Sequence, residues 1–320
     1  MICQSTSRLF LDNSRSTGRE NRRQPRTDLE VCASQERNVP TKPRSRVTVD
    51  SEKLERIAAE LRAEVIGLSH RAKTPHLGSS LSCIDLLVAL YWGFLRTDAK
   101  KSESPDRDRF ILSKGHAAPA LYTTLCARGF FDKKLLQEYG NDRAALAEQP
   151  APNCAPGVEW ATGSLGHGLS VGIGMALAAR IQKRDYRTVV LLSDGECNEG
   201  SVWEAAMFAA AQKLGSLTVL VDYNKWQATG RSEEVMALAP LRDKWEAFGW
   251  ESYEVDGHDF AEIKTAFACA ELPDRTKPLA IVAHTIKGRG VSFMEDDNNW
   301  HYRIPNAEEL VAARKELALE

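Results

Sequence analysis

The sequence predicts an α/β fold: a three-layer, doubly wound and mainly parallel sheet with helices on both faces. The segments 187–193 and 217–224 are continuous runs of β-branched and aliphatic residues. Such runs are typical of parallel strands, which are buried on both faces. Between them lies a predicted helix, 199–215, which ends at Gly215. Alternating strands and helices indicate a doubly wound sheet, in which ligands bind at the carboxyl ends of the strands.

The chain before this core opens with helices. We expect the first to begin at Asp50 or Ser51, because one apolar face then repeats at three- and four-residue steps: Leu54, Ile57, Ala58, Leu61, Val65 and Leu68. A glycine-containing turn follows at 73–80, and a buried helix is predicted at 81–95.

Residues 108–125 predict a short strand, a loop ending at Gly115 and His116, and a further helix. Residues 156–181 form a glycine-rich loop that leads into a helix of small residues, which lets the backbone come close to a ligand or another helix. The last third of the chain predicts a strand, a helix and a strand at 253–259, 260–271 and 278–288.

Residues 1–46 differ from the rest of the chain. They are rich in Arg, Ser, Asn and Pro and have no sustained apolar period, so we expect a disordered extension. Their nine arginines are typical of a transit peptide, but their five acidic residues argue against one. An overlong start-site assignment explains the segment equally well. We expect order to begin near Val49 and residues 47–320 to form one domain, since no linker divides them.

Composition excludes several classes of protein. The net charge of -2, without a basic face after the N-terminal segment, gives no sign of a nucleic-acid partner. The longest apolar stretch, 81–95, is too short for a membrane span and contains Asp85. The seven cysteines are scattered and odd in number, which favours a reduced, cytoplasmic location over a disulfide framework.

Two polar residues follow neighbouring predicted strands. Asp194 comes directly after the first strand, and Asn224 ends the second strand 30 residues later. Both are expected at the same edge of the sheet, where their oxygens suit a hard cation such as Mg²⁺. Gly195 would let the backbone approach the phosphate oxygens that Mg²⁺ often keeps as ligands. On its own, Asp194 could instead be a nucleophile or only the N-cap of the next helix.

Five motifs together resemble the thiamine-diphosphate-binding half of the transketolase family, in the family's order. They are TPHLGSS (74–80), DRFILSKGHAAPALY (108–122), TGSLGHGLSVGIGMALA (162–178), SDGE with VDYN (193–224), and DNNWHY (297–302). The fourth motif differs from the family pattern in having Ser193 for a glycine and Tyr223 for an asparagine. The resemblance covers about residues 50–305 and implies the thiamine-diphosphate-binding fold.

The resemblance implies a role for each matching residue. Mg²⁺ would be held by three groups: Asp194, Asn224 and the carbonyl of Trp226. The catalytic histidines at the diphosphate and the substrate would be His76, His116 and His301. The cofactor would also contact Gly163, Ser164, Leu165 and Gly195. Two acids would lie at a dimer interface that links active sites: Glu199 and Glu204.

Full transketolases carry a second domain with a glutamate that activates the cofactor, and this chain ends at Glu320. The resemblance therefore implies a split enzyme, completed by a C-terminal transketolase-like subunit in an α2β2 assembly. Such an enzyme transfers a two-carbon ketol unit from a ketose donor to an aldehyde acceptor, with sugars or sugar phosphates as substrates.

Two departures from the family leave other functions open. Gln149 stands where the family has a histidine that contacts the donor sugar, and His167 replaces a glutamine. The donor could then be an α-keto acid, or the chain could be a non-catalytic scaffold that kept the fold. A nucleotide-binding oxidoreductase is a weaker alternative, because 155–162 is a poor strand and Asp185 precedes a strand instead of ending one.

Four other polar residues give weaker indications of function. Lone histidines are usually structural, and we interpret three of them in this way: His70, His258 and His284. Lys287, in IKGRG, is either a phosphate contact or part of a solvated loop.

Overall fold

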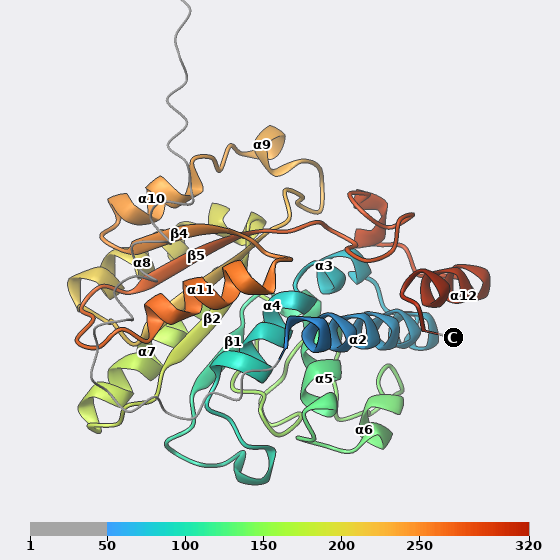
Figure 1. Ribbon diagram of the computed structural model, residues 1–320, viewed down its shortest axis with the longest axis horizontal. Coiled ribbons are helices and arrows are strands. Elements are labelled where there is room, and N and C mark those ends of the chain that lie inside the picture. The colour runs from blue at the N-terminus through green and yellow to red at the C-terminus, as the bar shows by residue number, and fades with distance from the viewer. Residues whose placement is uncertain (1–49, 320) are drawn as a thin grey trace, which may run out of the picture.

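A five-stranded parallel sheet lies at the centre of the computed structural model, which describes residues 50–319 (Figure 1). The strands are β1 (Arg109–Leu112), β2 (Thr188–Ser193), β3 (Leu217–Tyr223), β4 (Glu251–Asp256) and β5 (Leu279–His284). Their order across the sheet is β1-β2-β3-β5-β4, and all neighbours pair in parallel. The predicted doubly wound parallel sheet is confirmed. The predicted extension, residues 1–46, lies outside the described residues.

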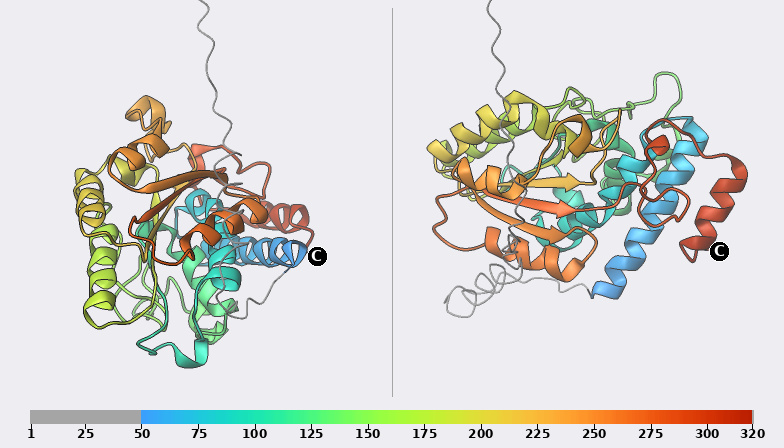
Figure 2. Two further views of the ribbon diagram at one scale, coloured as in Figure 1. Left: turned by 60° about the vertical axis from the view of Figure 1, so that its left-hand side comes forward. Right: turned by 90° about the horizontal axis from the view of Figure 1, so that it is seen from above.

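Every residue of β2 and β3 is buried, as their continuous apolar runs predict. Alternate side chains of these strands enter two different cores. Val189 and Leu191 pack with one set of helices: α2 (Ser51–Ala72), α4 (Ile84–Ala89), α5 (Ala118–Ala127) and α11 (Phe260–Ala270). Val190 and Leu192 pack with the other: α7 (Gly168–Ile181), α8 (Gly200–Ala211) and α10 (Leu241–Ala247). Figure 2 shows the sheet between these two layers.

Four further α-helices lie in the described fold: α3 (Leu77–Ser82), α6 (Lys133–Gln137), α9 (Ser232–Val235) and α12 (Ala307–Glu316). Among the described residues, no helix combines the length and the apolar character needed to cross a membrane.

Two sequence predictions about helix boundaries are wrong. The turn at 73–80 and the helix at 81–95 are instead α3, α4 and a π-helical turn, Leu90–Phe94, with a break at Cys83. The Ser82 hydroxyl donates to the carbonyl of Ser79 and to Asp222 of the sheet, and such side-chain bonds compete with a continuous helix.

The second correction concerns Gly215, which does not end the helix before it. That helix, α8, ends at Ala211, and Lys213 takes the left-handed conformation with φ 54. A Cβ placed on Gly215 would lie 1.9 Å from the carbonyl oxygen of Arg275. The glycine therefore permits a close approach of two backbone segments.

Candidate active site at the carboxyl edge of the sheet

The parallel register brings the ends of β2 and β3 together. Ser193 pairs with Asp222, and the amide of Asp194 donates to the carbonyl of Asp222 at 3.2 Å. Asp194 Oδ2 then accepts from the amide of Lys225 at 2.8 Å, directly beside Asn224. Asp194 is 0% exposed and Asn224 3%, so a carboxylate and an amide lie side by side in a buried position.

Hydrogen bonds hold both side chains. Asp194 accepts from the hydroxyl of Ser232 at 2.7 Å and from the amide of Gly195 at 2.9 Å, so it also caps a short 3₁₀ turn. Burial raises the pKa of Asp194 to about 7, against the effect of the Ser232 hydroxyl. The Asn224 amide group donates to Asp222 Oδ2 at 3.3 Å, which leaves its oxygen facing the amide of Trp226 at 3.1 Å.

A buried ion pair that sequence reasoning missed lies under this edge. Lys114 Nζ contacts Asp222 Oδ2 and donates to the carbonyl of Ser79 at 2.9 Å. Both charged side chains are 0% exposed. Burial alone would raise the pKa of Asp222, but Lys114 and the hydroxyls of Ser82 and Thr285 hold it below its usual value. The only sequence signal was a lysine close to His116, and its partner is 108 residues away.

Three predicted histidines converge above this pair. The ring centroids of His76 and His301 are 4.9 Å apart, and that of His116 is 5.4 Å from His76 and 5.9 Å from His301. Burial, assisted by nearby lysines, lowers the pKa of all three, that of His301 to about 3. The imidazoles are therefore neutral at pH 7. His76 has φ 68, and its amide donates to the carbonyl of His301 at 2.8 Å.

Lys287 joins this cluster, so its interpretation as part of a solvated loop is wrong. It is 0% exposed, and its Nζ lies 2.7 Å from Asn298 Oδ1 and 3.2 Å from His301 Nδ1. An ammonium group can only donate, so the neutral His301 carries its proton on Nε2. Burial, and after it Lys114, lowers the pKa of Lys287 to about 8.

The glycine-rich loop closes one side of the cluster. A Cβ placed on Gly115 would lie 2.6 Å from the amide nitrogen of Gly163, so the loop packs directly beside His116. Gly163 has φ 138, and the side chain of Gln149 covers it. Ser164 is exposed, and the half-buried Leu165 has a carbonyl that accepts from His167 Nδ1 at 2.9 Å. The loop therefore meets the histidine cluster at Gly163, beside Gly115.

The two predicted interface acids lie apart from the histidines, on an outer surface. Glu199 is the N-cap of α8 and packs against Gly166, and Glu204 is exposed one turn further along. Beside them on α8, Met207 is 53% and Phe208 48% exposed. Helix α8 and its N-cap therefore expose two acids and two large apolar side chains.

The family model described as transketolase, thiamine diphosphate binding domain, matches residues 54–320. The chain belongs to the transketolase family. It is 42% identical to a subunit of apulose-4-phosphate transketolase from Phocaeicola vulgatus, over 83% of this chain and 94% of that one. It is 41% identical to 6-deoxy-6-sulfo-D-fructose transketolase subunit SqwG of a Clostridium species, over 69% of this chain and 80% of that one.

Solved transketolase structures share the fold. The transketolase from Campylobacter jejuni has a TM-score of 0.80 and is 26% identical over 85% of this chain. The transketolase from Leishmania mexicana has a TM-score of 0.79 and is 25% identical over 83% of this chain. The chain spans 44% and 41% of those two proteins.

The residues of the site fit the cofactor of the transketolase family. Several buried polar atoms of the described residues lack a hydrogen-bond partner, and two of these atoms lie beside glycines of the site. They are Gln227 Nε2, whose side chain packs on Gly195, and Thr162 Oγ1, which lies against Gly115. Unsatisfied buried groups of this kind indicate a missing polar ligand. Together with the ammonium group of Lys287, they suit a diphosphate.

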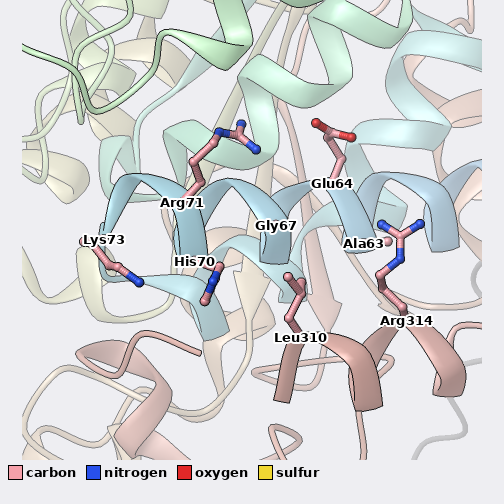
Figure 3. A pocket seen from close by; sticks show the side chains of 8 residues that line it. All are labelled: Ala63, Glu64, Gly67, His70, Arg71, Lys73, Leu310 and Arg314. Atoms are coloured by element: carbon pink, nitrogen blue, oxygen red, sulfur yellow. The ribbon is translucent and has the colours of Figure 1, made fainter. Parts of the chain in front are cut away.

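Two of the remaining histidines have structural partners. His70 Nδ1 donates to the carbonyl of Pro305 at 2.7 Å, and His284 pairs with Glu254 at 3.5 Å. A separate pocket of about 530 Å³ lies between α2 and α12 (Figure 3). Its lining residues include His70 but none of the predicted catalytic, cofactor or metal residues: Ala63, Glu64, Gly67, His70, Arg71, Lys73, Leu310 and Arg314.

Proposed function

We propose that this chain is the N-terminal subunit of a two-chain transketolase, which transfers a two-carbon ketol unit from a ketose to an aldehyde. The observation that carries the proposal is the convergence of three neutral histidines and Lys287 beside the buried Asp194 and Asn224. This arrangement combines a cation site, a diphosphate site and proton-transfer groups at the carboxyl edge of one parallel sheet.

Mg²⁺ would be held by Asp194, the oxygen of Asn224 and the carbonyl of Trp226. Asp222 supports this role, because it takes the Asn224 amide hydrogens and so leaves the oxygen for the cation. A divalent cation would also reverse the effect of burial on the carboxyl group of Asp194, because it favours the charged form.

The diphosphate would be bound by Lys287, the Gln227 amide and the backbone at Gly195, and the aminopyrimidine would lie along Gly163, Ser164 and Leu165. When bound, thiamine diphosphate supplies the electron sink for cleaving and forming the carbon–carbon bond. His301 would donate from Nε2 to a sugar oxygen, since Lys287 occupies Nδ1. His76 and His116, neutral at pH 7, would accept or return protons of the sugar hydroxyls.

A partner subunit completes the site in this proposal. Relatives at 42% and 37% identity are named as single subunits of a transketolase, and these names imply a second chain. The exposed Met207 and Phe208, with Glu199 and Glu204, offer an apolar surface with two acids for an α2β2 assembly. The substrates would be sugars or sugar phosphates, as in the relatives' names, and the location would be cytoplasmic.

The first test is calorimetric titration of thiamine diphosphate into the full chain, with and without Mg²⁺. We expect Mg²⁺-dependent binding in the wild type and in Asp243→Ala, an exposed position on α10, and no binding in Asp194→Ala. The same preparations, mixed with the partner subunit, should form product from a ketose donor. Absence of both binding and turnover in the complete complex would refute the proposal.

A further inference from the structure

A buried network of polar side chains lies beside the site and has no role in the mechanism described so far. Arg62 of α2 donates through both terminal nitrogens to Asp85 of α4, at 3.0 and 2.6 Å. His258, in the turn between β4 and α11, has its Nδ1 2.6 Å from Asp85 Oδ2. The side chains of Arg62, Asp85 and His258 are only 7%, 6% and 8% exposed. The network therefore joins α2, α4 and the turn before α11, which belong to neighbouring elements of the fold.

The network fixes the position of the proton on His258. Burial alone would raise the pKa of Asp85, but Arg62 and His258 hold it below its usual value, so Asp85 is an ionised acceptor. His258 Nδ1 therefore donates to Asp85. Its other nitrogen, Nε2, accepts from the backbone amide of Ile286 at 2.9 Å. A neutral histidine with one donor and one acceptor nitrogen satisfies both contacts.

Ile286 belongs to the segment 285–288, which carries Lys287 into the site. On either side of Ile286, the Thr285 hydroxyl bonds to Asp222, and the amide of Gly288 donates to the carbonyl of Gly78 at 3.0 Å. The bond from Ile286 to His258 anchors the residue directly before Lys287. Without this bond, the segment would be held only at Thr285 and Gly288, and the backbone that carries Lys287 would lose its nearest anchor.

We propose that His258 is a positioning residue, which holds segment 285–288 so that the Lys287 ammonium lies against His301 and faces the diphosphate. The identity of the anion rests on the proposed function, whereas the positioning of Lys287 does not. Outer residues of this kind orient a ligand-binding group without touching the ligand.

Two variants separate the two bonds of His258. In His258→Asn, the amide nitrogen can replace Nδ1 and keep the bond to Asp85, but nothing reaches the amide of Ile286. In His258→Gln, the amide oxygen can replace Nε2 and keep the bond to Ile286. His284→Asn is the matched control, because His284 is 37% exposed at the end of β5 and its ion pair is with Glu254.

The first readout is the affinity of the full chain for Mg²⁺ and inorganic pyrophosphate. We expect roughly 10-fold weaker binding in His258→Asn, a smaller loss in His258→Gln, and no change in His284→Asn. In a Lys287→Met background, His258→Asn should cost nothing further, because it acts through that lysine. Additive losses, or equal losses in the Asn and Gln variants that follow their melting temperatures, would show a structural role only and overturn the inference.

The second readout needs no ligand: the titration of Lys287 by NMR of labelled lysine, assigned with Lys287→Arg. The groups that act on Lys287 are Lys114, which lowers its pKa, and three acids that raise it: Asp194, Asp222 and Asp297. In the wild type we expect titration near pH 8, because the pKa of the buried Lys287 is about 8. In His258→Asn it should move toward the value of about 10.4 for a solvated lysine. An unchanged Lys287 titration would overturn the inference even if pyrophosphate binds, whereas failure of the wild type to bind pyrophosphate bears on the proposed function alone.

Discussion

The two sides of the site are built in different ways. On one side, Asp194 and Asn224 are placed by the backbone register of β2 and β3. On the other side, His76, His116 and His301 come from three segments far apart in the sequence, and they meet through ring contacts and one main-chain bond from His76 to His301. The strand edge is fixed by main-chain hydrogen bonds, and the histidine cluster depends on buried charges beneath and beside it. The same cofactor would therefore bind to one rigid side and one side that is easier to alter.

The largest effect should come from the buried ion pair of Lys114 and Asp222, which lies next to both sides of the site. Lys114→Met leaves Asp222 buried without its cation, and breaking such a pair costs about 3–5 kcal/mol of unfolding free energy. Chemical denaturation measures this loss. The double variant Lys114→Met with Asp222→Leu should recover part of it, because no uncompensated charge remains. A single variant as stable as the wild type would contradict this account.

A second prediction alters the histidine side alone. His116→Gln removes a neutral proton acceptor, so transfer by the complete complex should fall about 100-fold in kcat. Binding of thiamine diphosphate with Mg²⁺ should weaken far less, since Asp194 and Asn224 are untouched. Steady-state kinetics and calorimetry on the same preparation separate the two effects. Equal losses in both would mean that the two sides do not act independently.

The two sides should respond to pH in opposite directions in the metal-free protein. The pKa of Asp194 rises from 3.8 to about 7 on folding, so its contribution to stability is lost as pH rises through that window. The pKa of His301 falls from 6.5 to about 3, so its contribution is lost as pH falls through that window. For the buried Asp194 the effect is on the order of 4 kcal/mol, since a change of one in pKa corresponds to about 1.4 kcal/mol.

Thermal unfolding in a chelator, followed across both windows, checks this contrast. Asp194→Asn should flatten the decline toward neutral pH, and His301→Gln should flatten the decline toward acid. If either variant keeps the wild-type pH profile, the assignment of that slope is wrong.

The smallest effect is expected from Glu148, an exposed residue next to the histidine cluster. Glu148 Oε1 lies 3.9 Å from His76 Nδ1, and Gln149 covers Gly163. Because Glu148 is 54% exposed, Glu148→Gln should change kcat/KM by less than about 10-fold, with the ratio between two ketose donors changing more than either value. Competition between donors measures that ratio. A uniform change for all donors would argue against a role in specificity.

The fold was largely predictable because its signals are local. The apolar runs of β2 and β3 and the periodic face of α2 lie within single segments, and each was predicted within a few residues. The break at Cys83 was not predicted; the adjacent Ser82 bonds to Asp222, which is 140 residues away. Local propensity carries no information about such a partner.

The candidate site divides in the same way. The strand order places Asp194 beside Asn224, so simple rules for parallel sheets were enough. The histidines could be grouped only through the motifs of the transketolase family. Neither route reached Lys114 with Asp222, or Asp85 with His258, which are 108 and 173 residues apart. Long-range pairing of buried charges leaves no periodic pattern in a sequence.

The exposed apolar side chains of α8 bear on how long the chain would survive in the cell without a partner. Met207 and Phe208 are exposed in this chain and would stay so until the proposed partner covers them, and exposed apolar patches are bound by chaperones and favour aggregation. A copy of this chain made in excess of its partner would be removed by proteases, while the assembled copy would persist. The amounts of the two chains would then be matched after synthesis, by the survival of those that find each other.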